Sequence, residues 1–187
     1  MFQEKNRQGV HILFFLFAFL LKFLSRFQVI ILLLVLLFLT VAVIPKLKVK
    51  NYLYRHFEKK YSHGAIYYFL TLLGITLFFP LHIVAVAWIV LALGDGMATL
   101  VGRNFKTQEL PWNKDKSYYG SLSFIFFATL GSFIILKWML PSLSLGQALS
   151  IGLKTSIVAA FIETLPWELD DNISVPLVSA LVVSFLI

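Results

Sequence analysis

Long, uninterrupted apolar stretches constrain this chain more than any other feature of its sequence. Several of them approach or exceed the roughly 18 to 20 residues that a helix needs to cross a bilayer. They are too long and too numerous for one water-soluble core, since 59% of the 187 residues are hydrophobic and only 13% are charged. The sequence therefore predicts an all-α, polytopic membrane helical bundle that forms a single domain over residues 1–187.

We expect about seven transmembrane helices. The predicted spans cover residues 9–24, 27–44, 64–79, 81–102, 119–140, 145–165 and 173–187. Pro45, Pro80, Pro141 and Pro166 fall at predicted span ends, where a helix can stop without losing interior hydrogen bonds. The last span reaches only about 22 Å against a hydrocarbon core of about 30 Å, so it either tilts in a thinned bilayer or begins inside the protein.

Basic residues gather on one side of this predicted topology. Twelve of the 16 Lys and Arg residues share that side, namely Lys5, Arg7, Lys46, Lys48, Lys50, Arg55, Lys59, Lys60, Arg103, Lys106, Lys114 and Lys116. The positive-inside rule then predicts a cytoplasmic membrane protein with a cytoplasmic amino terminus. All nine acids lie in the same predicted half, so an active site would be cytoplasmic as well.

The charge and composition also limit the partners and the chemistry. We expect the basic segment 46–60 to contact anionic lipid headgroups. Nucleic acid is disfavoured as a partner because the positive charge follows topology and is not gathered on a soluble surface. The chain has no cysteine, which excludes disulfides, thiolate metal sites and a cysteine nucleophile.

The segment LGDGMATLVGR, residues 93–103, places an acid within an apolar span. If the span is helical to Gly102, Asp95 lies about 10 to 12 Å before Arg103 along the axis and hence below the headgroups. Inserting such an acid costs about 2.5 to 3.5 kcal/mol, so it calls for a partner or a function. Two structural alternatives stay open: Asp95 caps a helix that restarts after a break at Gly94, or it pairs with Lys154.

Small residues surround this acid. Asp95, Ala98 and Gly102 share one helix face, which would let another helix approach closely. Gly94 and Gly96 allow backbone conformations that other residues resist.

Two further polar segments lie on the same predicted side. The first, GRNFKTQELPWNKDKSYYGS, supplies bases and a glycine-containing helix start, both of which favour phosphate. The second, ETLPWELDDNISVP, contains Asp170, Asp171 and Asn172, whose oxygens suit Mg²⁺. An Asx turn that caps the last span is the alternative for these three residues. Acids for a metal and bases for phosphate near the acyl region predict phosphoryl transfer to an amphiphile. No Walker-type loop is present, which disfavours a P-loop ATPase.

Three motifs carry a family resemblance. GDGMATLVGRNF, KDKSYYGS and ELDDNISVPLVSALV resemble, in order and spacing, the membrane family of phytol, farnesol and dolichol kinases and CTP-dependent diacylglycerol kinases. Phosphatidate cytidylyltransferases are its more distant relatives. The likeness extends to EKNRQGVH and to HGAIYYFLTLLGITLFFP, and so covers nearly the whole chain. It implies transfer of the terminal phosphate of a nucleoside triphosphate, often CTP, to an isoprenoid alcohol or diacylglycerol.

The resemblance also points to particular residues. Asp95 looks like the motif acid, Gly94, Ala98, Gly102 and Arg103 match the surrounding pattern, Lys116, Ser117 and Gly120 match the loop motif, and Asp171 and Asn172 match the late Asp-Asn pair. We expect phosphate or nucleotide contacts from Gly94, Gly96, Arg103, Lys114, Lys116, Ser117 and Gly120. Asp95, Asp170, Asp171 and Asn172 are the expected Mg²⁺ ligands. Asp95, Asp171 or His11 is expected to accept the hydroxyl proton.

Two departures from the family pattern and three alternative functions remain. Gln8 stands where the family usually has Lys, and residues 104–106 lack the glycine that often follows the Arg-containing motif. Both departures bear on the choice of alcohol. The alternatives are a phosphatidate cytidylyltransferase that makes CDP-diacylglycerol, a cation-binding transporter with a broken fourth helix, and a family member without activity.

Overall fold

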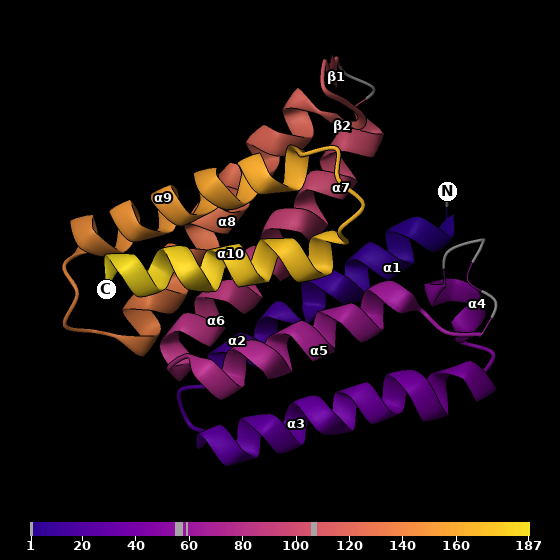
Figure 1. Cartoon of the computed structure of the whole chain (residues 1–187), viewed down its shortest axis with the longest axis horizontal. Coiled ribbons are helices and arrows are strands. Elements are labelled where there is room, and N and C mark those ends of the chain that lie inside the picture. Colours follow the sequence, from indigo (N-terminus) through magenta and orange to yellow (C-terminus); the bar gives the residue numbers. More distant parts are fainter. Residues whose placement is uncertain (1, 55–57, 59, 106–107) are drawn as a thin grey trace.

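The computed structural model describes residues 2–54, 58, 60–105 and 108–187, with side chains from residue 6 onward. Arg55, Lys59, Lys106 and the side chain of Lys5, which enter the charge pattern above, lie outside this part. The described chain is mostly helical (Figure 1). Its elements are α1 (Phe2–Leu13), α2 (Phe15–Leu20), α3 (Arg26–Phe38), η1 (Leu39–Val43), η2 (Ile44–Lys46), α4 (Lys50–Leu53), α5 (His63–Phe78), α6 (Leu81–Ile89), η3 (Val90–Asp95), α7 (Gly96–Asn104), β1 (Glu109–Leu110), β2 (Asn113–Ser117), α8 (Tyr118–Met139), α9 (Leu145–Thr164) and α10 (Asp171–Leu186).

Each of the seven predicted spans is helical, but they differ in length. Four helical stretches are long and apolar enough to cross a membrane, namely Arg26–Lys46, Leu81–Asn104, Tyr118–Met139 and Leu145–Thr164. The stretches Asn6–Leu20, His63–Phe78 and Asp171–Leu186 are apolar but shorter. The helical membrane bundle is thus supported, while seven crossings stay a prediction.

Local sequence signals set where these helices begin. Ser25 with Gln28 and Ser144 with Gln147 form capping boxes at the starts of α3 and α9. Asp170 accepts a hydrogen bond from the backbone of Asn172 at the start of α10. Such caps satisfy the amide groups that a first helical turn leaves without partners.

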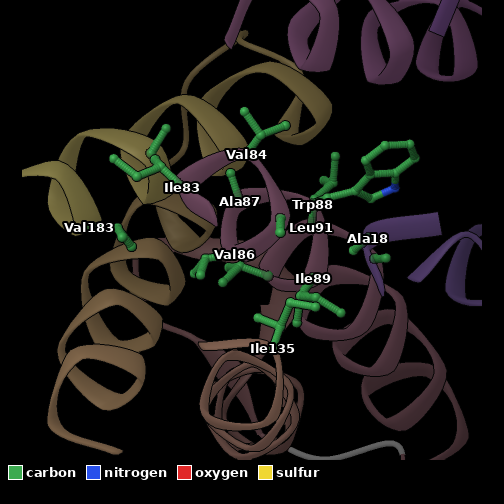
Figure 2. Packing of buried hydrophobic residues seen from close by; sticks show 14 of the residues in the cluster. Ala18, Ile83, Val84, Val86, Ala87, Trp88, Ile89, Leu91, Ile135 and Val183 are labelled. Carbon is green, nitrogen blue, oxygen red and sulfur yellow. The ribbon is translucent and has the colours of Figure 1, made fainter. Parts of the chain in front are cut away.

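Helix α6 forms the centre of the bundle. Its residues from Ile83 to Ile89 are almost completely buried. Figure 2 shows them packed between Ala18 of α2, Ile135 of α8 and Val183 of α10. Helix α3 lies at the outside, next to α5 (Figure 1). Phenylalanines such as Phe27 on α3 and Phe185 on α10 are largely exposed, as expected for side chains that face lipid.

A short antiparallel hairpin of β1 and β2 connects α7 to α8 and is the one departure from an all-α chain within the described residues. Leu110 pairs with Asn113 across its turn. Strand β2 ends at Ser117, whose Oγ accepts a hydrogen bond of 3.2 Å from the backbone N–H of Gly120 and so caps α8. The hairpin positions Lys116 at the end of the bundle where α9 and α10 meet.

The small residues around Asp95 permit close packing, as predicted for Ala98 and Gly102. A Cβ atom at Gly120 of α8 would lie 3.2 Å from the Ala98 carbonyl oxygen and 3.6 Å from the Gly102 Cα atom. Helices α7 and α8 therefore cross nearly backbone to backbone.

The expectation of unusual backbone conformations at Gly94 and Gly96 is wrong, because no described glycine has a positive φ. Space, not backbone freedom, explains these two residues. A Cβ atom at Gly94 would lie 2.9 Å from the Phe124 ring, and one at Gly96 would lie 2.5 Å from Ile12 Cγ1. These contacts give both glycines a packing role.

Candidate active site

Three carboxylates from three helices meet at one end of the bundle. Asp95 lies where η3 meets α7, Glu163 lies in the last turn of α9, and Asp171 is the first residue of α10. One oxygen atom from each lies within 4.8 Å of the other two. Glu163 is 3% exposed and Asp95 is 9% exposed. Ionised carboxylates that are this close together and shielded from water repel one another strongly. The cluster therefore needs a cation.

Lys116 supplies one positive charge. Its Nζ donates a hydrogen bond of 2.7 Å to Asp171 Oδ2 and a second, very short one to Glu163 Oε1. Burial lowers the pKa of Lys116, but Glu163, Asp171 and Asp95 raise it by more, so the net pKa lies above its ordinary value. Lys116 therefore stays protonated, and when all three carboxylates are ionised the cluster has an excess of two negative charges.

His11 of α1 approaches the cluster through Asp95. Its Nε2 lies 3.1 Å from the Leu91 carbonyl oxygen and 3.5 Å from Asp95 Oδ2. The Leu91 carbonyl belongs to η3, a π-helical stretch inside the span Leu81–Asn104. Such π-helical turns occur frequently at functional sites. With its proton on Nε2, the imidazole donates to Leu91, and Asp95 lies just beyond that contact.

Both structural alternatives for Asp95 are wrong. Its side chain makes no cap hydrogen bond, and its backbone is helical, so it does not cap a restarted helix. Lys154 is exposed on α9, nine residues before Glu163 and therefore about 13 Å away along that helix. Within the described part of the chain, no ion pair joins Lys154 to Asp95.

The two neighbours of Asp171 are hydrogen-bonded to each other. Asp170 Oδ1 accepts hydrogen bonds from the backbone N–H and the side-chain Nδ2 of Asn172, at 2.9 and 2.7 Å. Asp170 and Asn172 thus form the Asx cap of α10, which was the alternative for this segment. Of the expected Mg²⁺ ligands, Asp95 and Asp171 belong to the three-carboxylate cluster, whose third member is Glu163. Mg²⁺ contacts of Asp170 and Asn172 stay predictions.

Four of the residues that were expected to bind phosphate divide into two groups. Ser117 and Gly120 have structural contacts, since Ser117 caps α8 and Gly120 lies at the α7–α8 crossing. Arg103 and Lys114 have exposed side chains. Arg103 is in the last turn of α7, about 12 Å beyond Asp95, and Lys114 is two residues before Lys116 on β2. Their contacts with phosphate stay predictions.

Glu163 is the residue that sequence reasoning missed. It was one of nine acids on the predicted cytoplasmic side, and nothing in its spacing links it to Asp95 or Asp171. The available signal was its place near the carboxyl end of an apolar span, where an uncompensated acid is costly.

Comparisons with known proteins agree with the motifs. No protein-family profile matches the chain, and no solved structure matches it significantly. A protein named "Probable phytol kinase 3, chloroplastic" from Glycine max is 38% identical over 136 residues, which cover 66% of this chain and 41% of that protein. "Farnesol kinase, chloroplastic" from Arabidopsis thaliana is 37% identical over 130 residues, covering 63% and 41%. "Phytol kinase 1, chloroplastic" from the same plant is 36% identical over 131 residues, with the same two coverages.

The chain spans about two fifths of the length of these curated relatives. The names of these relatives place those proteins in chloroplasts, whereas the charge pattern of this chain predicts a cytoplasmic membrane. The apolar helices and the matches together support an integral membrane protein related to kinases that act on alcohols. The chain is thus similar in sequence to proteins named phytol kinase and farnesol kinase, in agreement with the resemblance of its three motifs.

Proposed function

We propose that this chain is an integral membrane kinase that transfers the terminal phosphate of a nucleoside triphosphate, with CTP as the expected donor, to the hydroxyl of an isoprenoid alcohol. The observation that carries the proposal is the convergence of Asp95, Glu163 and Asp171 beside Lys116 at one end of an apolar bundle. The relatives named phytol kinase and farnesol kinase support the class of acceptor. Diacylglycerol is the alternative acceptor.

The carboxylate cluster fits Mg²⁺. It offers only oxygen atoms, and its two excess negative charges match a divalent cation. Oxygens bound to one Mg²⁺ lie about 2.0 to 2.1 Å from the ion and hence up to about 4.2 Å apart. The 4.8 Å limit of the cluster therefore needs only a small contraction or a bridging water. A bound Mg²⁺ would neutralise charge on the phosphate oxygens of the nucleotide.

Several residues of the chain would position the reactants. Lys116 lies next to the carboxylates and would contact phosphate oxygens once a cation shares the charge of Glu163 and Asp171. Arg103 and Lys114 would hold phosphates from the exposed side. The site would then face the side of the membrane that carries most basic residues, where lysines such as Lys50 would contact anionic lipid headgroups.

The transfer is a single displacement. The alcohol oxygen forms a bond to the terminal phosphorus while the bond from that phosphorus to the bridging oxygen breaks, and the nucleoside diphosphate leaves with the bridging oxygen. The hydroxyl proton passes to Asp95, Asp171 or His11. His11 Nε2 lies 3.5 Å from Asp95 Oδ2, so its N–H would stabilise the negative charge of Asp95 before the proton arrives.

The test uses the full chain, purified in detergent. Phytol, farnesol, dolichol and diacylglycerol are each supplied with CTP, ATP, UTP or GTP labelled at the terminal phosphate. We expect a labelled isoprenoid phosphate, with Asp95→Asn as a control that inserts normally but makes none. A second reaction with phosphatidate and CTP labelled at the α-phosphate tests for the cytidylyltransferase. CDP-diacylglycerol as the only product, or no labelled alcohol with any donor, would overturn the proposal.

A further inference from the structure

Tyr68 on α5 and Trp88 on α6 each bury a polar group in the interior of the bundle. Neither the Tyr68 hydroxyl nor the Trp88 indole N–H makes a hydrogen bond of good geometry with a described residue. Tyr68 is 3% exposed and Trp88 is fully buried. Buried polar groups are normally paired, and lipid offers them no substitute for water. An oxygen atom from outside the chain could therefore accept a hydrogen bond from each of these two groups.

Both groups lie beside the candidate active site. The Tyr68 ring packs edge-on against the ring of His11, with 5.0 Å between the centroids. His11 Nε2 in turn lies 3.5 Å from Asp95 Oδ2. The Trp88 indole lies within reach of a weak hydrogen bond to the Tyr68 hydroxyl, and the Asp95 carboxylate is near enough for its charge to act on that hydroxyl. One small oxygen could therefore be shared by Tyr68, Trp88 and the His11–Asp95 pair.

Aromatic rings extend from this polar point. Phe17 stacks on Trp88 with 6.1 Å between centroids and 6° between planes. Phe14 packs against Tyr68 at 5.9 Å and against Phe69 at 5.3 Å. Phe14 and Phe17 are only partly buried, so the aromatic surface continues toward the lipid side of the bundle. Its rings offer apolar contact to a branched hydrocarbon chain.

From this arrangement we infer that Tyr68 and Trp88 bind the hydroxyl of the acceptor alcohol, while Phe14 and Phe17 contact the first part of its isoprenoid chain. A hydroxyl oxygen accepts two hydrogen bonds and donates one. It would accept from the Tyr68 O–H and the Trp88 N–H, and would donate its one proton toward Asp95. The inference rests on the proposed function and adds the acceptor subsite to it.

Asp95 would then separate two halves of the active site. On one side, His11, Tyr68 and Trp88 from α1, α5 and α6 would hold the alcohol. On the other side, Glu163 and the residues around it from α9, α10 and β2 would hold the phosphate end. The reacting oxygen and the terminal phosphate would meet at Asp95.

Conservative variants of the full chain test the inference. Tyr68→Phe and Trp88→Phe each remove a donor and keep an aromatic ring. Tyr67→Phe is the matched control, because Tyr67 is the next residue on α5 and is 39% exposed. The KM for farnesol and for the nucleotide is measured, together with equilibrium binding of radiolabelled farnesol without nucleotide.

We expect each of the two buried variants to weaken farnesol binding and to raise its KM about tenfold, the usual effect of one lost hydrogen bond. The KM for the nucleotide should stay as in the wild type, which also shows that the variants are folded. Wild-type farnesol affinity in both variants would overturn the inference and leave the kinase proposal standing. If no alcohol is phosphorylated but farnesol binding falls in both variants, the subsite stands and the proposed reaction fails.

Discussion

Replacing Lys116 by methionine keeps the apolar stem and removes the ammonium that lies between Glu163 and Asp171. The variant leaves Glu163, which is almost fully buried, and Asp171 without the ammonium that pairs with them. Breaking a buried ion pair by removing one partner costs about 3 to 5 kcal/mol. The Lys116 side chain is 22% exposed, so solvent screening favours the lower end, about 3 kcal/mol. At about 2 to 4 °C per kcal/mol, Tm should fall by roughly 6 to 12 °C in metal-free buffer.

The assay is thermal unfolding in detergent, followed by tryptophan fluorescence with and without Mg²⁺. Because the cation would replace the positive charge that the variant has lost, Mg²⁺ should stabilise Lys116→Met more than it stabilises the wild type. Lys114→Met is the matched control, since Lys114 is exposed on the same strand and should unfold at the wild-type temperature. Equal unfolding temperatures for the Lys116 and Lys114 variants in metal-free buffer would refute the reasoning.

Three further predictions use other parts of the chain. Glu163→Gln should lower kinase activity at least about 100-fold, whereas the exposed Glu168→Gln should stay near wild type; equal activities would exclude Glu163 from the site. Gly120→Ala should destabilise the chain by about 1 to 3 kcal/mol because backbone atoms of α7 lie within 3.2 to 3.6 Å of the new Cβ atom. Gly146→Ala meets nothing within 4 Å and should stabilise α9 by up to about 1 kcal/mol, so a chemical denaturation series should show opposite signs. The pKa of Lys116 is higher in the folded chain than in the unfolded chain. Its ion pairs therefore stabilise the fold fully at any pH below the unfolded-state pKa of about 10.4, and this stabilisation is lost only as the pH rises through the folded-state pKa. The Tm difference between wild type and Lys116→Met should therefore persist from about pH 8 to about pH 10, and a loss within this window would contradict the ion pairs.

Hydropathy predicted the helices well because burial in lipid demands long apolar segments whatever the tertiary packing. The topology also predicted the meeting of Asp95 and Asp171, since both were assigned to one side of the membrane, and Lys116 joined them there. Glu163 was not predicted because its inclusion depends on how α9 is rotated about its own axis. Composition and charge pattern contain no information on that angle.

The sequence did not predict that Asp170 and Asp171 make different contacts. The two residues are adjacent and chemically alike, yet Asp170 caps α10 and Asp171 enters the carboxylate cluster. Which of them does so depends on the residue where α10 begins, and one residue on a helix turns a side chain by about 100°. Gly94 was misread for a related reason, because the Phe124 ring that demands its small size comes from another helix.

Direct measurement of divalent-cation binding tests the central claim that α7, α9 and α10 together form one metal site. Mn²⁺ can replace Mg²⁺ at oxygen ligands and can be counted by its electron paramagnetic resonance signal. The account predicts one Mn²⁺ per wild-type chain and at least about tenfold weaker binding in Asp95→Asn, Glu163→Gln and Asp171→Asn, with Glu168→Gln unchanged. Wild-type Mn²⁺ affinity in the Asp95 and Glu163 variants would show that these carboxylates do not share an ion, and would contradict the account.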